Sequence, residues 1–224
     1  MRFIFTLSII FFALFQIVWP QESNKLEAII DKIQQKYEKI NDFNSKFTQE
    51  ATVRALDQVQ KANGEVWFKK PGKMRWNYFR PTKDQIVSDG ITLWFYNEEE
   101  NQVIESFLNE VMETPTTTTL LSGLGNINKL FNASFSTNNQ FKGNEIYLID
   151  LLPKEQDEEY NKATVAVDKK SLLVKTIYLY DPFGNLTIIR LRDIQTNKGI
   201  PDSMFKFNVP KGAEIVRLPP SKKQ

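Results

Sequence analysis

Apolar residues on both faces of the expected strands constrain this chain more than any other feature. A strand with one face in water alternates apolar and polar residues, because successive side chains point to opposite sides of a sheet. Val66-Trp67-Phe68, Ile91 to Tyr96 and Ile177 to Tyr180 break that alternation. Both faces of the sheet must therefore meet apolar surroundings. A packed sandwich, an apolar cavity and a surface covered by a partner all satisfy this requirement.

The strands themselves are indicated by a period of two that begins after Asn41 and by closely spaced turn signals. Asn63-Gly64, Pro71-Gly72 and Asp89-Gly90 are among these signals. The expected strands are 43–54, 60–70, 73–79, 84–89, 91–97, 101–107, 132–138, 141–152, 162–168, 172–181, 184–194 and 204–208. Many short strands joined by tight turns are typical of an antiparallel meander, which forms either a sandwich or a curved, barrel-like sheet.

Two helical segments accompany the strands. The first precedes them and has six apolar residues on one face: Leu26, Ile29, Ile30, Ile33, Tyr37 and Ile40. A narrow apolar stripe of this kind is expected to pack on a sheet. The second segment, 112–130, interrupts the strands with Pro115 near its start and Gly123 and Gly125 near its end. It predicts one or two short helices whose apolar face consists of Leu120, Leu121 and Leu124.

The N-terminus has the pattern of a secretory signal. Arg2 precedes an apolar run from Phe3 to Trp19, although no small-x-small cleavage site stands out after it. We expect a signal peptide at 1–22, with an uncleaved anchor as the alternative. A single domain then covers 23–212, and a flexible tail rich in proline and lysine covers 213–224.

Composition excludes several classes of function. The 224 residues contain no histidine and no cysteine, which excludes serine triads, histidine-ligated zinc and thiol nucleophiles, and no metal site or cofactor is expected. Lysine and arginine number 29 against 27 acidic residues, so the net charge of +2 argues against a nucleic-acid partner. A carboxylate hydrolase remains as an alternative. Its strand candidates are Glu65, Glu105, Glu145 and Asp150.

The stretch from Lys69 to Tyr96 resembles a known family. It reads Lys69-Lys70-Pro71-Gly72-Lys73-Met74-Arg75-Trp76-Asn77-Tyr78, then Ile86-Val87-Ser88-Asp89-Gly90 and Thr92-Leu93-Trp94-Phe95-Tyr96. With Phe43-x-x-x-Phe47-Thr48-Gln49 upstream and Phe205-Lys206-Phe207-x-Val209-Pro210-x-Gly212 at the end, it resembles the outer-membrane lipoprotein carrier family. These segments follow the family's order over nearly the whole mature chain.

The resemblance implies a mainly β (α+β) fold: one antiparallel sheet curved into an incomplete β-barrel, with an N-terminal helix and a short helical lid. It also implies a monomeric periplasmic carrier, without enzymatic activity, that binds the acyl chains of lipid-modified lipoproteins. Such a carrier takes its cargo from an inner-membrane lipoprotein-releasing transporter and delivers it to an outer-membrane lipoprotein receptor. A periplasmic glycolipid-binding sensor is the alternative use of the same cavity.

The resemblance also assigns residues. The acyl-chain cavity would be lined by Val66, Phe68, Met74, Trp76, Tyr78, Leu93 and Phe95. The lid would consist of Leu120, Leu121 and Leu124. Lys70 stands where the family often has an arginine that hydrogen-bonds the lid backbone. A lysine keeps the charge but lacks the planar fork of five donors, so its lid contact would use fewer hydrogen bonds.

Overall fold

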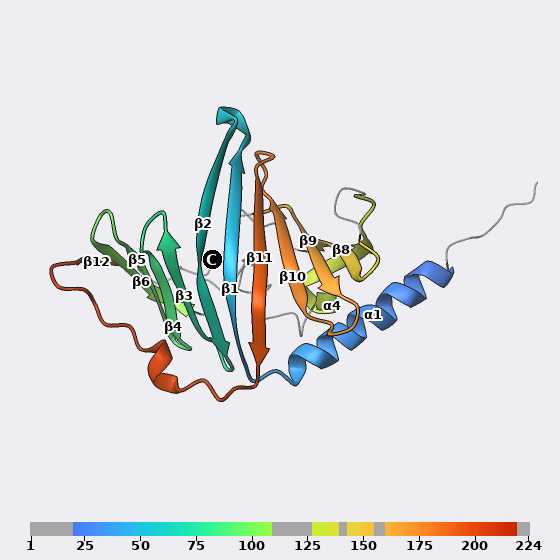
Figure 1. The fold of residues 1–224 in the computed structure, drawn as a ribbon, viewed down its shortest axis with the longest axis horizontal. Helices are drawn as coiled ribbons and strands as arrows, with labels where there is room; N and C mark the ends of the chain where they lie inside the picture. Colours follow the sequence, from blue (N-terminus) through green and yellow to red (C-terminus); the bar gives the residue numbers. More distant parts are fainter. Residues whose placement is uncertain (1–19, 109–126, 139–142, 155–159, 219–224) are drawn as a thin grey trace, which may run out of the picture.

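A computed structural model describes residues 20–108, 127–138, 143–154 and 160–218 of the chain. Within these ranges, twelve strands form one curved, open sheet in the order β12-β6-β5-β4-β3-β2-β1-β11-β10-β9-β8-β7 (Figure 1). The strands are β1 (Asp42–Val53), β2 (Gln58–Lys69), β3 (Lys73–Arg80), β4 (Gln85–Asp89), β5 (Thr92–Asn97), β6 (Gln102–Phe107), β7 (Phe131–Phe135), β8 (Ile146–Pro153), β9 (Lys162–Asp168), β10 (Val174–Tyr180), β11 (Leu186–Thr196) and β12 (Glu214–Arg217). The expected mainly β fold is confirmed.

Helix α1 (Pro20–Glu38) covers the concave face of the β8–β11 half of the sheet (Figure 1). Ile29, Ile33 and Tyr37 of its apolar stripe are buried in the main core cluster, together with Ile177 of β10 and Val165 of β9. Helix α4 (Ile127–Leu130) is a single turn beside α1 and leads into β7. The helix that the sequence predicts is therefore present, and it packs on the sheet through the predicted face.

A C-terminal segment, residues 197–213, lies on the convex face of β3–β5. It begins after β11 and contains the 3-10 helix η4 (Asp202–Phe205), whose Phe205 is buried against β3 and β4. Further along, the Phe207 ring stacks on Trp94 of β5 with centroids 5.8 Å apart. The segment thus covers the Trp94 ring on the convex side of β5.

Two expectations for the C-terminal region are wrong. Residues 204–208 do not form a strand, since η4 and an extended stretch occupy that range. Glu214–Arg217, expected within a flexible tail at 213–224, form β12, which pairs in parallel with β6. Residues 219–224 of that tail lie outside the described ranges. β12 has only four residues and pairs with a strand more than 100 residues earlier, so the local sequence does not predict it.

The convex face of β8–β11 carries a second apolar cluster. Leu148, Ala166 and Tyr178 are buried there and pack with partly buried neighbours on the same strands. These residues alternate with concave ones along their strands, so Leu148 is convex and Ile149 is concave. The uninterrupted apolar runs of β8 and β10 thus serve two clusters on opposite faces.

Gly64 lies inside β2 rather than in a turn, which corrects the interpretation of Asn63-Gly64 as a turn signal. The β1–β2 connection is instead the 3-10 helix η1 (Arg54–Leu56), with Asp57 in the left-handed region at φ 48°. At Gly64 the register with β3 shifts. A Cβ at this position would collide with the carbonyl oxygen of Asn77 and lie 2.9 Å from the Phe47 ring. Glycine is needed here because a ring and a neighbouring backbone approach it closely.

The expected signal peptide falls mostly outside the described residues, which begin at Pro20. Helix α1 starts at Pro20, inside the range 1–22 that the sequence assigns to the signal. Among the described helices, none is both long and apolar enough to cross a membrane.

Candidate functional site

The concave face of β1–β3 is an aromatic surface built by strand register. Phe43 of β1 lies opposite Phe68 of β2, which lies opposite Met74 of β3. The Phe43 and Phe68 rings stack with centroids 4.8 Å apart. Further along β1, the Phe47 ring meets the Trp76 ring edge-on with centroids 4.8 Å apart. Residues directly opposite one another point to the same face, so these strands present a continuous apolar surface.

All seven residues predicted to line a cavity lie on this concave face. Val66, Phe68, Met74 and Trp76 are buried in the main core cluster. Tyr78 and Leu93 are partly buried and pack against the same cluster. Phe95 is half-buried and shares the side of β5 that carries Leu93, opposite Ile86 of β4. The structure therefore brings the seven together on one face of β2, β3 and β5.

A few polar groups interrupt this aromatic surface. The Tyr78 hydroxyl donates to Gln49 Oε1 at 3.2 Å, and burial, with a smaller contribution from Asp84, raises the pKa of Tyr78 to about 12. The Trp76 Nε1–H group is buried and has no acceptor among the residues that the structure describes. Ser45, opposite Val66, adds a buried hydroxyl that donates to the Arg192 carbonyl oxygen at 2.7 Å. The face is thus mostly apolar, and its hydroxyls are matched while the Trp76 indole donor is not.

The concave face is closely packed where the end of α1 lies over β10 and β11. Between α1 and β10–β11, a cavity lined by Tyr37, Phe43, Leu191 and neighbouring residues measures only about 10 Å³. That is about the space of one water molecule. The Tyr37 hydroxyl accepts a hydrogen bond of 3.0 Å from the buried Val174 N–H, which fixes the helix to β10. An alkyl chain has no room here while α1 is in place.

Lys70 lies at the end of α1. Its ammonium donates to the carbonyl oxygens of Tyr37 at 2.7 Å and Glu38 at 3.2 Å. These are carbonyls of the last helical turn, where a positive charge is favourable. The predicted lid residues Leu120, Leu121 and Leu124 lie outside the described residues. The hydrogen bonds described for Lys70 therefore connect β2 to α1, a contact that the sequence did not suggest.

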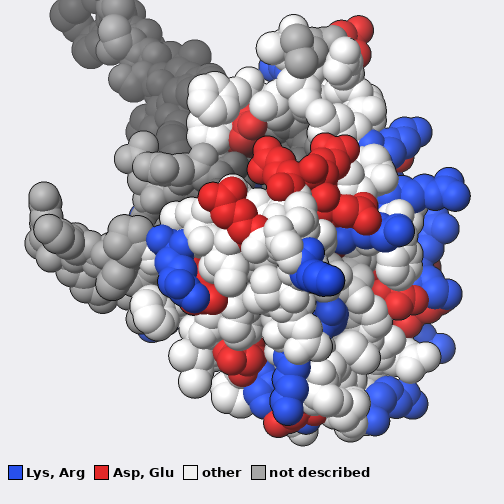
Figure 2. Space-filling view, turned by 90° about the vertical axis from the view of Figure 1, so that its left-hand side faces the viewer, with Lys and Arg blue, Asp and Glu red and all other residues white. Residues whose placement is uncertain are grey.

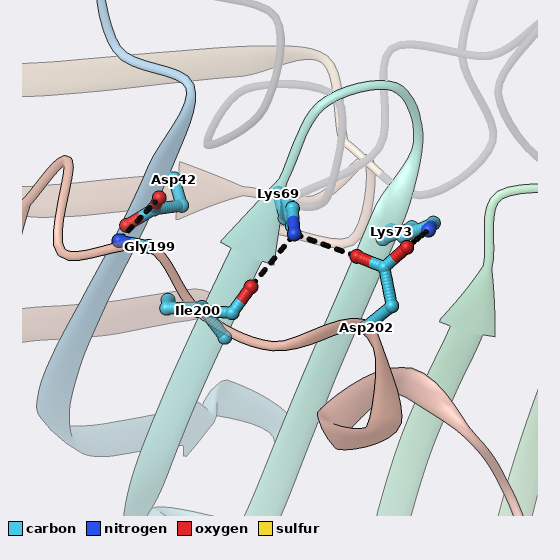
Figure 3. Close-up of polar contacts among 6 residues, drawn as sticks. All are labelled: Asp42, Lys69, Lys73, Gly199, Ile200 and Asp202. Carbon is cyan, nitrogen blue, oxygen red and sulfur yellow. Dashed lines mark hydrogen bonds and ion pairs between the residues drawn. The ribbon is translucent and has the colours of Figure 1, made fainter.

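Lys69 points to the opposite face of the sheet (Figure 3). Its ammonium donates to the Ile200 carbonyl oxygen at 2.7 Å and to Asp202 Oδ1 at 2.6 Å, and Lys73 donates to Asp202 Oδ2 at 2.6 Å. Hydrogen bonds from Lys69 and Lys73 lower the pKa of Asp202 to about 2. Asp42 holds the same segment by accepting from the backbone N–H of Gly199 at 3.0 Å. These contacts attach the C-terminal segment to the convex face.

The four carboxylates of the hydrolase alternative are not gathered on the concave face. Glu65 and Glu105 point to the convex side, and Glu105 accepts hydrogen bonds from Trp94 and Arg217, each at 3.1 Å. Glu145 is exposed just before β8. Within the described ranges, no cluster of three acidic residues could hold a metal ion.

Asp150 belongs to a buried polar group on the convex side. Burial raises its pKa, but hydrogen bonds from Lys162, Thr164 and Ser136 outweigh that effect and lower the pKa overall. Lys162 Nζ lies 2.9 Å from Oδ2, and Thr164 Oγ1 lies 2.6 Å from Oδ1. The carboxylate thus accepts hydrogen bonds from three side chains, as expected for a structural contact between β8 and β9.

Charged side chains of both signs are interspersed on the surface. On the side shown in Figure 2, several acidic residues gather in the upper part and basic residues are frequent along the right-hand edge, while residues of both signs also lie in the lower half among uncharged surface. This distribution agrees with the small net charge of +2 and forms no continuous basic surface on that side.

Comparison with known proteins gives consistent matches. Residues 38–208 match the family model described as outer membrane lipoprotein carrier protein LolA. An outer-membrane lipoprotein carrier protein of Pseudomonas entomophila is 31% identical over 85% of this chain and 89% of its own length. The corresponding protein of Nitrosomonas europaea is 28% identical over 78% and 82%. An uncharacterized conserved protein from Thermus thermophilus shares the fold, with a TM-score of 0.56, 11% identity and coverage of 87% and 99%.

Proposed function

Because this chain belongs to the outer membrane lipoprotein carrier family LolA, we propose that it shuttles lipoproteins from the inner to the outer membrane by holding their acyl chains against its concave face. The family is periplasmic and consists of carriers rather than enzymes. In this proposal, an inner-membrane lipoprotein-releasing transporter loads the carrier, and an outer-membrane receptor unloads it. The carrier acts as a monomer and uses no cofactor.

The observation that carries this proposal is the aromatic concave surface of β1–β3 and its continuation onto β5. Alkyl chains are held by apolar area and shape, and aromatic side chains supply large rigid surfaces for this purpose. Val66, Phe68, Met74, Trp76 and Tyr78 provide the centre of the proposed site, with Leu93 and Phe95 at its side. The contact between the end of α1 and β10–β11 is too closely packed for a chain, and we place the cargo beside α1, over β2–β5.

Energetics favour partial burial of the cargo. Each buried methylene contributes about 0.8 kcal/mol, so one sixteen-carbon chain could contribute about 12 kcal/mol. Two fully buried chains would exceed the practical limit of roughly 18–21 kcal/mol for non-covalent binding. A carrier must release what it binds. Part of each acyl chain should therefore remain outside the carrier, in contact with water or with the protein part of the cargo.

The positions of the carboxylates support a carrier rather than a hydrolase. Glu65, Glu105 and Asp150 all lie on the convex side, away from the proposed cargo. Asp150 and Glu105 are also engaged by basic side chains, Lys162 and Arg217. Acid–base chemistry on a bound lipid would need such groups within hydrogen-bond reach of it.

The test is to express the full chain in a Gram-negative host, purify it from the periplasm and identify bound material by mass spectrometry. The informative variant is Leu93→Glu, which puts a charge on the concave side of β5. The matched control is Thr92→Glu, one residue away and on the other face. A carboxylate in an apolar site is strongly unfavourable, so Leu93→Glu should reduce recovered lipoprotein at least tenfold and Thr92→Glu should leave it near the wild-type level.

Three outcomes would contradict the proposal. Wild-type protein purified without lipoprotein would remove its basis. Recovery of glycolipid alone would favour the sensor alternative. Equal loss in both variants, with both still folded by circular dichroism, would show that the concave side of β5 is not the binding face.

A further inference from the structure

Trp76 combines deep burial with an unmatched hydrogen-bond donor. It lies in the middle of β3 and is only 3% exposed. Its ring is edge-on to Phe47, and the Phe68 ring lies at 6.1 Å with an interplanar angle of 87°. Its Nε1–H group has no acceptor in the described part of the chain. Such a donor has lost its bond to water and gained none from the protein, which is rare in folded proteins.

Neighbouring polar groups show that this chain can supply acceptors where it buries donors. Trp94, on the convex face two strands away, donates its Nε1–H to Glu105 Oε2 at 3.1 Å. Tyr78, two residues after Trp76 on the same face, donates to Gln49. The unmatched indole donor lies at the centre of the aromatic surface, where the proposed cargo would lie.

An unmatched donor inside a binding surface implies an acceptor on the ligand. An alkyl chain has none along its length. The carbonyl oxygen at its root, in an ester or amide, is the acceptor that every acyl chain brings with it. An indole N–H donates one hydrogen bond and accepts none, so it suits a carbonyl oxygen and not another donor.

We propose that Trp76 Nε1–H donates a hydrogen bond to the acyl carbonyl oxygen of bound cargo, so that this carrier distinguishes acyl chains from plain alkyl chains. The inference rests on the proposed function. The bond fixes the depth of the chain, with the carbonyl at Trp76 and the methylenes extending over Phe47, Phe68 and Met74. Trp76 is then a specificity-determining residue as well as part of the apolar surface.

The experiment compares two synthetic lipopeptides. Both carry an N-terminal cysteine joined by a thioether to glycerol. One bears two hexadecanoyl esters and the other two hexadecyl ethers, which lack the carbonyl groups. Competition against a fluorescent fatty acid gives the affinity ratio for the wild type, Trp76→Phe and Trp94→Phe. The two lipopeptides also differ in hydrophobicity, but that difference is the same for every protein. It therefore cancels when the affinity ratios of the three proteins are compared.

We expect the ester-to-ether affinity ratio to be about five times larger for the wild type and Trp94→Phe than for Trp76→Phe. A factor of about five is the effect of one hydrogen bond. Equal ratios in all three proteins would overturn the inference and leave the proposed function standing. If neither lipopeptide binds the wild type, the proposed function fails and this inference fails with it.

A second measurement uses the wild-type chain, so it does not depend on the folding of Trp76→Phe. In a ¹⁵N-labelled sample, the ester lipopeptide should move the Trp76 indole N–H proton resonance downfield, as expected for a new hydrogen bond. The ether lipopeptide should leave that proton without a downfield shift. The same shift with both compounds would contradict a bond to the carbonyl oxygen.

Discussion

Lys69 and Lys70 are consecutive residues that hold opposite faces of the sheet. The Lys69 ammonium lies 2.6 Å from Asp202 in the C-terminal segment on the convex side, and the Lys70 ammonium lies 2.7 Å from the Tyr37 carbonyl oxygen in α1. Successive side chains of an extended backbone point to opposite sides, so one lysine pair at the end of β2 reaches both covering segments.

Acid should loosen the C-terminal segment through Asp202. Its pKa is lowered from 3.8 to about 2 because Lys69 and Lys73 donate to it. A depressed pKa in the folded state means that this stabilisation is complete above about pH 4 and is lost as the pH falls towards 2. Hydrogen exchange of residues 199–206 should therefore accelerate in this range relative to the β9–β10 strands. Asp202→Asn should remove this pH dependence, and an unchanged profile in that variant would contradict the assignment.

Lys70→Leu should loosen the end of α1. The substitution removes the donor to the Tyr37 and Glu38 carbonyl oxygens, and a positive charge at a helix end contributes about 0.3–1 kcal/mol. We expect faster amide exchange in α1 and altered lipoprotein uptake and hand-off. Lys70→Arg is the matched control and should preserve both. Unchanged exchange and unchanged transfer in Lys70→Leu would show that this contact has no part in carrier function.

Tyr37→Phe should destabilise the fold by about 1–3 kcal/mol, because it leaves the buried Val174 N–H without an acceptor. The free energy of unfolding in urea measures the effect. Tyr96→Phe removes a hydroxyl whose bond, to Asn101 at 3.2 Å, is half-exposed, and it should cost much less. A similar loss of unfolding free energy in both variants would contradict a larger contribution from the buried Tyr37–Val174 hydrogen bond.

Gly64→Ala should destabilise by about 1–3 kcal/mol through overpacking. The new methyl group would meet the Asn77 carbonyl and the Phe47 ring, which fills the concave surface beside Trp76. Gly143→Ala is the control, since its nearest neighbour would be at an ordinary 3.4 Å. Both variants can be compared by thermal unfolding. Equal melting temperatures for the two would refute the close approach at Gly64.

The period-two pattern from Phe43 to Tyr180 was sufficient to predict the sheet, because each strand pairs mostly with a sequence neighbour and its turn lies nearby. The same period places Val66 with Phe68, and Met74 with Trp76, on one side of their strands, but only the register shows that both pairs share the concave face. The covering of the convex face could not be predicted. It depends on Phe205 and Phe207 reaching strands more than 100 residues earlier, and neither residue has a local pattern that indicates its destination.

The contact of Lys70 with α1 is another feature that the sequence did not indicate. The family resemblance suggested a contact with the lid, which lies outside the described residues and stays a prediction, and an ammonium can donate to any suitably placed carbonyl. The end of α1 presents two such carbonyls, and the position of that end depends on how the helix packs over β10 and β11. The unmatched indole of Trp76 was likewise invisible in the sequence, since a tryptophan on an apolar strand face usually has a partner.

The attachment of both covering segments to β2 has a consequence for the order of folding. Lys70 meets Tyr37 across 33 residues of chain, whereas Lys69 meets Asp202 across 133. Closing the longer loop costs more entropy and brings together parts of the chain that are made far apart in time. A chain truncated before residue 197 would keep the strands β1–β11 and α1 on their concave face. Without residues 197–213, however, Trp94 on the convex side of β5 would face water. Such a fragment would be expected to aggregate through its convex side.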